Sequence, residues 1–289
     1  MNSGELDAII RLLDDPDPTV YNILEQKLVS EGTGVLGSLC SVLDHNPGRL
    51  LKTRIGNITH QIRKNDIAQS LSQWKDNDDD LLKGAWIVSK YEYPDRGYAS
   101  LLDDFNTLAG RLEVIDTQNF SPLEQIKIVN HIFFKQLKFS SSAPPDFFLP
   151  DNSFITYTLD RRTGNTITMA VVYMLLAQHC RIPLYGVNLP KNFILAYVSP
   201  EDNHPLFYIN PFNQGAVLNE DEIVFFLKQQ NISPQSQFFN KCPNTVIIQR
   251  LLHNLKSSYE RLKWTHCVRE IDGFLKIFKN GLSAKIEWE

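Results

Sequence analysis

A hydroxyl and two carboxamides stand at the boundaries of three consecutive segments in the central part of the chain. Thr166 begins one apolar run, Asn192 precedes a second, and Asn210 ends a third, directly before a proline. A threonine hydroxyl does not ionise unaided at neutral pH, and an asparagine carboxamide forms hydrogen bonds but does not take up a proton. These groups can therefore bind an amide or a peptide, whereas nucleophilic or acid–base catalysis needs ionisable groups that they lack.

The segments that carry these residues alternate between helical and strand-like patterns. Apolar spacing and β-rich runs predict helices over 166–180 and 220–229 and strands over 184–188, 193–198 and 206–209. One long helix packed on an antiparallel sheet is an α+β arrangement of layers. An irregular segment with three prolines, residues 140–153, precedes these elements and cannot be the interior of a helix.

Helical patterns flank this centre on both sides. Residues 5–110 contain successive short apolar stripes, with helices expected near 35–43, 50–63, 66–74 and 81–91 and a helix start at Asp17-Pro18. These patterns favour a small α-solenoid or an irregular bundle. From residue 243 two further amphipathic helices resemble a tetratricopeptide-type hairpin. We therefore expect three parts, residues 1–115, 116–242 and 243–289.

A capping box marks the start of the central part. In the sequence Ser121-Pro122-Leu123-Glu124, the serine hydroxyl and the glutamate can satisfy amides at the start of a helix over 122–137. His131 lies on this otherwise apolar helix and is the one imidazole that we consider as a relocated base, although a structural histidine is the simpler interpretation.

Composition excludes several classes of protein. The chain has 289 residues, of which 43% are hydrophobic, and a net charge of −4 without a basic stripe, so nucleic acid is not an expected partner. Four scattered cysteines predict neither a disulfide framework nor a zinc site. Because no signal peptide and no apolar run of about 18 residues is found, we expect a cytoplasmic protein without a membrane segment.

The acidic run at residues 76–80 has the carboxylates of a calcium loop but not its closing residues. An EF-hand needs glycine at position six and glutamate at position twelve, and Leu81 and Ile87 occupy those places. We expect a solvated helix start here, and neither a metal nor a cofactor in this protein.

Three phrases in the centre resemble the SirB-type branch of the transglutaminase-like superfamily, which is related to papain-like cysteine proteases. They are Gly164-Asn165 at a helix start, the run Ile182–Pro190, and Tyr208-Ile209-Asn210-Pro211-Phe212-Asn213. The resemblance implies a core in which a Cys begins the helix, a His lies on the next strand and an Asp on the one after it. The matching residues here are Thr166, Asn192 and Asn210.

This resemblance implies a retained fold with lost thiol chemistry. A helix N-terminus and a neighbouring imidazole activate a thiol, and a carboxylate orients that imidazole. With all three groups replaced, we expect no catalytic residue, and a pocket for protein or peptide ligands formed by Gly164, Asn165, Thr166, Asn192 and Asn210. The protein would then be a pseudoenzyme and a binding module, of unknown oligomeric state.

Two alternatives stay open. The first is an amide hydrolase or acyltransferase of the same fold that uses Thr166 or a base such as His131. The second is a helical scaffold whose cleft is idle; Thr166 would then be a first-turn hydroxyl and Gly164-Asn165 a helix-entry turn.

Overall fold

The computed structural model describes residues 3–77, 80–113 and 119–278, which divide into two compact units, Met1–Ser72 and Gln73–Glu289. This division differs from the three expected parts. The second unit contains the central elements together with residues 81–113 and 243–278. Within this unit, α11 (Asn244–Arg261) contacts both α5 (Leu81–Ser89) and α9 (Thr166–His179).

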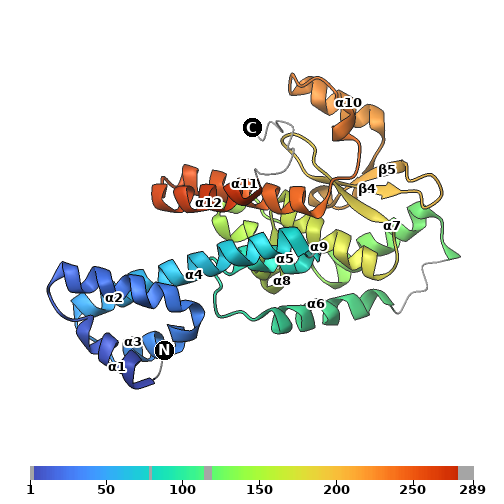
Figure 1. Ribbon diagram of the computed structural model, residues 1–289. Helices are drawn as coiled ribbons and strands as arrows, with labels where there is room; N and C mark the ends of the chain where they lie inside the picture. Colours follow the sequence, from blue (N-terminus) through green and yellow to red (C-terminus); the bar gives the residue numbers. More distant parts are fainter. Residues whose placement is uncertain (1–2, 78–79, 114–118, 279–289) are drawn as a thin grey trace. The chain divides into compact units, whose positions relative to one another are not determined.

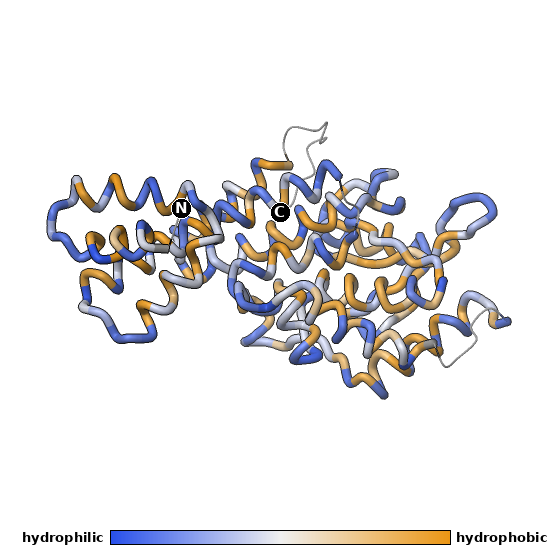
Figure 2. The backbone as a smooth tube through the Cα atoms, turned by 60° about the horizontal axis from the view of Figure 1, so that its bottom comes forward, coloured by the Kyte–Doolittle hydropathy of each residue, from blue (hydrophilic) through white to orange (hydrophobic). Residues whose placement is uncertain are grey.

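The first unit is helical. Its elements are α1 (Ser3–Leu12), α2 (Pro18–Glu31), the 3₁₀ turn η1 (Gly32–Val35), α3 (Leu36–Asp44) and the part of α4 (Arg49–Asn77) up to residue 72. Their apolar stripes form one core that includes Leu13, Leu28, Leu39 and Ile58, all fully buried. Apolar and polar bands alternate along these helices in Figure 2, as expected for elements that bury one face.

Two details of this unit compare directly with the sequence. Asp17 accepts a hydrogen bond from the Thr19 amide at 2.8 Å and Pro18 begins α2, which confirms the expected helix start. The two helices expected over 50–63 and 66–74 are a single helix, α4. No proline or glycine lies between them, so nothing in the backbone ends the first helix.

The second unit contains a four-stranded antiparallel sheet between helices. The strands β3 (Leu184–Val187), β4 (Ile194–Val198), β5 (Pro205–Asn210) and β6 (Ala216–Leu218) pair in sequence order. Helix α9 packs on one face, and α10 (Glu220–Gln229) covers the other, as Figure 1 shows. The second face carries Ile194, Ala196 and Val198, which cluster with Ile223 and Leu227 of α10.

The remaining elements surround this helix-on-sheet core. They are α6 (Tyr98–Glu113), α7 (Pro122–Asn130), the π-helix η3 (His131–Gln136), α8 (Ile155–Arg161) and α12 (Thr265–Phe278). The Ser121 capping box is confirmed, with Glu124 accepting from the Ser121 amide at 2.9 Å. Helix α8 and strand β6 were not expected from the sequence; both are short, and β6 has only three residues. The helix pair α11 and α12 pack along each other, and Figure 1 shows them side by side.

Gly215 ties α7 to the loop that follows β5. Its φ of +70° lies in the left-handed region, and its carbonyl accepts from Asn130 Nδ2 at 3.0 Å. Asn130 Oδ1 in turn accepts from the Tyr173 hydroxyl of α9 at 2.8 Å, and burial raises the pKa of Tyr173 well above its ordinary value, which keeps it a donor. A Cβ on residue 215 would overlap the Asn130 carboxamide.

We predict that Gly215→Ala lowers the free energy of unfolding by about 1–3 kcal/mol, because it adds backbone strain and breaks a partly buried polar contact. The matched control is Gly110→Ala in α6, where a Cβ meets nothing within 4 Å. This control should be neutral or raise stability by about 0.5–1 kcal/mol. Urea unfolding measures both, and equal effects of the two substitutions would contradict the assigned role of Gly215.

Candidate functional site

The candidate site is built around the start of α9. Asn165 is the N-cap: its Oδ1 accepts from the amides of Ile167 and Thr168, both at 3.2 Å, and its Nδ2 donates to Ser153 Oγ at 2.9 Å. Thr166 is the first residue of the helix and is half-buried. The helix-capping role considered for Thr166 from the sequence therefore belongs to Asn165. Asn165 is buried, with 5% of its surface exposed.

The irregular segment before α8 is attached to this helix start by a set of hydrogen bonds. Strand β1 (Ser140–Ser141) pairs in parallel with β2 (Thr163–Gly164), and Ser142 Oγ donates to the Gly164 carbonyl at 2.9 Å. Thr168 Oγ1 donates to the Asn152 carbonyl at 2.8 Å. Gly164 is buried, and a Cβ there would lie 2.8 Å from Thr158 Oγ1, so this position packs tightly and does not face a ligand.

Asn192 and Asn210 lie near the same end of the sheet, since β4 begins two residues after Asn192 and β5 ends at Asn210. Each uses its Oδ1 locally. Asn192 accepts from the Phe193 amide at 2.8 Å, and Asn210 accepts from the amides of Phe212 and Asn213 at 3.1 and 3.3 Å. Asn210 has the extended backbone expected before a proline and caps the 3₁₀ turn η6 (Pro211–Asn213).

A cavity of about 130 Å³ opens beside Thr166. It lies between the start of α9, the loop before β4, the irregular segment and one face of α11. The lining residues are Phe147, Phe148, Asn165, Thr166, Lys191, Arg250, Asn254, Ser257 and Ser258. Of the five predicted ligand-binding residues, Asn165 and Thr166 thus line this cavity, whereas Gly164, Asn192 and Asn210 do not.

The turn that Asn210 caps nevertheless borders the same region. The Phe212 ring packs on Phe147, with 5.4 Å between ring centroids, and the Phe212 carbonyl accepts from Ser141 Oγ. Asn192 follows Lys191, which lines the cavity directly. The structure therefore brings together the three segments that carry Thr166, Asn192 and Asn210, although only Thr166 reaches the cavity itself.

The lining of the cavity is positively charged. Arg250 lies in the buried face of α11 with 6% exposure, and burial lowers the pKa of its guanidinium to about 10, which still leaves it cationic at neutral pH. Lys191 is exposed and also lines the cavity, and none of the described residues that line it is an Asp or a Glu. The N-terminus of α9 adds partial positive charge. An anionic group is the complement of this lining.

Arg250 and Lys191 were not among the predicted site residues. Arg250 left a signal in the sequence, because it interrupts an apolar helical pattern between Ile247 and Leu251. Nothing in the sequence distinguishes Lys191 from other surface lysines. His131, considered as a relocated base, is exposed and does not line the cavity.

Comparison with known families decides the classification. The model of the transglutaminase-like superfamily matches residues 99–253, more than half of the chain. The chain belongs to the transglutaminase-like superfamily. The match covers α9, the whole sheet and the first half of α11, so it includes every residue that lines the cavity except Asn254, Ser257 and Ser258.

Individual relatives place this transglutaminase-like chain in the SirB-type branch. It is 28% identical over 216 residues to a UPF0162 protein of Xylella fastidiosa, which covers 69% of this chain and 72% of the relative. It is also 28% identical over 194 residues to protein SirB1 of Salmonella typhimurium, covering 66% and 70% respectively.

A further relative is similar over a shorter stretch of the chain. Human F-box only protein 21 is 28% identical over 138 residues, which are 46% of this chain but 21% of that protein. No solved structure matches the chain. Within the described residues, no helix has both the length and the apolar character needed to cross a membrane.

We predict that Asn165→Ala lowers the free energy of unfolding by about 1–3 kcal/mol, because it leaves two amides and a serine hydroxyl without their partner in a buried place. The matched control is Asn219→Ala at the exposed capping box of α10, which accepts from the Glu222 amide at 2.9 Å. Thermal or urea unfolding should show the larger loss for Asn165→Ala. A smaller loss than that of the control would contradict the role assigned to Asn165.

Proposed function

We propose that this chain is a catalytically degenerate transglutaminase-like protein that binds protein or peptide ligands through the cavity beside Thr166. The ligand group that we assign to the cavity is a carboxylate, either the end of a chain or an acidic side chain. We further propose that the protein works in the cytoplasm and does not act on nucleic acids or membranes. The observation that carries the proposal is that one cavity is lined both by the buried Arg250 and by Thr166, a non-ionisable residue at the position of the nucleophile.

The chemical argument for lost catalysis starts from what each position can do. The thiol position holds Thr166, and the imidazole and carboxylate positions hold carboxamides that hydrogen-bond to backbone amides in their own turns. A hydroxyl at a helix start needs a neighbouring base to become a nucleophile. His131, the base considered from the sequence, is exposed and outside the cavity lining. These observations favour binding over hydrolysis or acyl transfer.

The argument for a carboxylate starts from the positive charge that Arg250 contributes to the cavity lining. An arginine guanidinium matches a carboxylate through paired N–H donors, and such charge-assisted hydrogen bonds are stronger than those between neutral groups. Lys191, the Thr166 hydroxyl and the Asn254 carboxamide line the same space and can donate further hydrogen bonds. An isolated chain-terminal or side-chain carboxylate is ionised at neutral pH.

The mouth of the cavity suits a peptide more than a small inorganic anion. Phe148 is 45% exposed there, and the Arg261 guanidinium lies 3.8 Å above its ring. An exposed aromatic surface beside a cationic cavity can hold an apolar side chain next to the bound carboxylate. The exposed ring beside the cationic cavity supports a polypeptide ligand. An idle cleft does not explain why the two lie together.

We predict that the immobilised full chain retains random hexapeptides with a free C-terminus at least tenfold better than the same peptides as C-terminal amides, when both pools lack Asp and Glu. A third pool, amidated but containing Glu, separates a side-chain carboxylate from a chain end. Mass spectrometry quantifies the retained peptides. Lys191→Gln should weaken retention at least tenfold, in line with about 1.5–3 kcal/mol for a charge-assisted hydrogen bond.

The matched control for this experiment is Lys241→Gln, since the Lys241 ammonium lies over the Tyr185 ring and donates to Asn203 Oδ1. It should leave retention unchanged. Arg250→Gln should abolish retention, and its folding is checked by circular dichroism. Retention of amidated peptides without Glu at the same level as free acids, or no effect of Lys191→Gln, would overturn the assignment of a carboxylate.

A further inference from the structure

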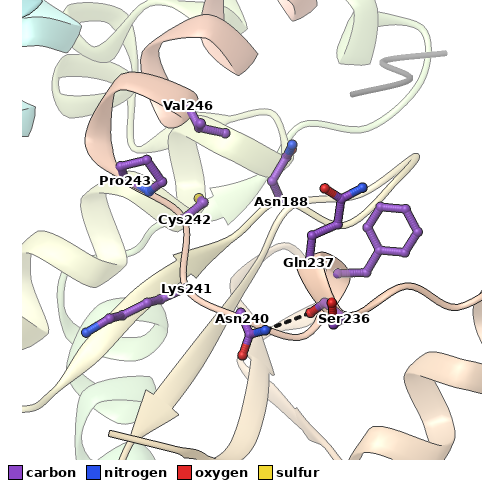
Figure 3. Close-up of a pocket in the computed structure, with 9 residues that line it drawn as sticks. Asn188, Ser236, Gln237, Asn240, Lys241, Cys242, Pro243 and Val246 are labelled. Carbon is purple, nitrogen blue, oxygen red and sulfur yellow. Dashed lines mark hydrogen bonds between the residues drawn. The ribbon is translucent and has the colours of Figure 1, made fainter. Parts of the chain in front are cut away.

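A second, larger cavity of about 360 Å³ lies at the other end of the β3–β4 loop, and it shares no lining residue with the cavity beside Thr166. Figure 3 shows it between the residue that follows β3, the segment 236–243 and the first turn of α11. Its lining residues are Asn188, Ser236, Gln237, Phe238, Asn240, Lys241, Cys242, Pro243 and Val246. A volume of this size is in the range of small-ligand pockets.

One polar atom in this lining lacks a partner. Asn188 is 8% exposed, and its Oδ1 is buried and accepts no hydrogen bond from any described residue. Buried acceptors are nearly always paired, because an unpaired one loses its hydration without compensation. In Figure 3 the side chains of Asn188, Cys242 and Val246 border the same space. A donor brought by a ligand would complete the hydrogen bonding of Asn188.

The lining presents no charge to that space. Burial raises the pKa of the Cys242 thiol to about 12, so it is neutral and can act as a weak donor at physiological pH. The Lys241 ammonium is directed away from the pocket, as Figure 3 shows, to Asn203 and the Tyr185 ring. The remaining wall is apolar and is formed by Phe238, Pro243 and Val246.

The rim of the pocket is fixed by hydrogen bonds to backbone carbonyls. The Cys242 amide donates to the Gly186 carbonyl of β3 at 2.8 Å, and Asn240 Nδ2 donates to the Ser236 carbonyl at 2.9 Å, the dashed line in Figure 3. Pro243 is the N-cap of α11. The pocket is therefore formed before a ligand arrives, which limits the ordering that binding requires.

We propose that this pocket binds an uncharged secondary amide, the peptide bond of a polypeptide segment, with an adjacent small aliphatic side chain against Phe238, Pro243 and Val246. The amide N–H donates to Asn188 Oδ1, and its carbonyl accepts from the Cys242 thiol. An alcohol or an apolar ligand makes only some of these contacts. A carboxylate would lose its hydration without gaining a cationic partner in this neutral lining. This inference goes beyond the carboxylate site, since it depends on none of its residues.

Three probes with the same isobutyl group test this proposal on the full chain. They are N-methylisovaleramide, which has one N–H, N,N-dimethylisovaleramide, which has none, and isovalerate, which is charged. ¹H–¹⁵N spectra should show saturable shifts for residues 236–246 with the first probe. The dissociation constants of the second and third probes should be at least tenfold larger.

Two variants assign the effect to Asn188. Asn188→Leu should weaken binding of the secondary amide at least tenfold without lowering the unfolding midpoint, because it removes an unpaired acceptor and keeps the volume. Thr166→Ala and Lys191→Gln should leave this binding unchanged, so failure here is distinguishable from failure of the carboxylate site. Equal binding of isovalerate or of the tertiary amide, undiminished binding by Asn188→Leu, or no saturable shift with the secondary amide would overturn the proposal.

Discussion

The start of α9 has to be buried and still have its backbone amides paired, and the rest of the site depends on how the chain meets this constraint. Helix α9 is apolar nearly all round and packs between the sheet and the flanking helices. The first amides of any helix have no partner within it. Asn165 supplies that partner and, through its Nδ2, holds Ser153 against the helix start. One carboxamide therefore both begins the helix and attaches the segment that forms the cavity wall.

Local hydrogen bonds of the same kind would preserve the core even if, as we propose, its catalytic chemistry is lost. In this chain the carboxamides of Asn192 and Asn210 complete turns at the end of the sheet, so they contribute to the local fold whether or not a nucleophile is present. The charges near Thr166 come from other positions, Lys191 in the loop before β4 and Arg250 in α11. In the function that we propose, the fixed positive charge of these two residues serves to bind an anion, and no proton transfer is needed.

How far the sequence predicts this structure follows from the range of the interactions. Capping signals at Asp17 and Ser121, the apolar run of α9 and the apolar period of α10 are local, and they predict the elements well. The expected ranges 50–63 and 66–74 leave out Lys64 and Asn65, but neither residue is a proline and α4 continues through both. The packing of α11 against α5 and α9 joins residues distant in sequence, and no local pattern records it.

The site divides in the same way. The family phrases identified Asn165 and Thr166, because the helix start is encoded within a few residues. They also suggested that three polar groups would converge, whereas the cavity receives its charges from Lys191 and Arg250. Arg250 reaches the cavity through the tertiary packing of α11. The unpaired Oδ1 of Asn188 is likewise a property of the folded chain. It depends on the described residues around it, those of the segment 236–243 included, which donate no hydrogen bond to this oxygen.

The central claim is that this transglutaminase-like core keeps its scaffold and has lost its nucleophile. The most direct measurement is the release of ammonia from carboxamide-containing peptides by the full chain, with hydroxylamine as acyl acceptor, compared with Thr166→Ala. The account predicts the same rate for both proteins, equal to that of buffer. A release of ammonia, or a covalent acyl adduct, that Thr166→Ala abolishes while leaving the fold intact would contradict it.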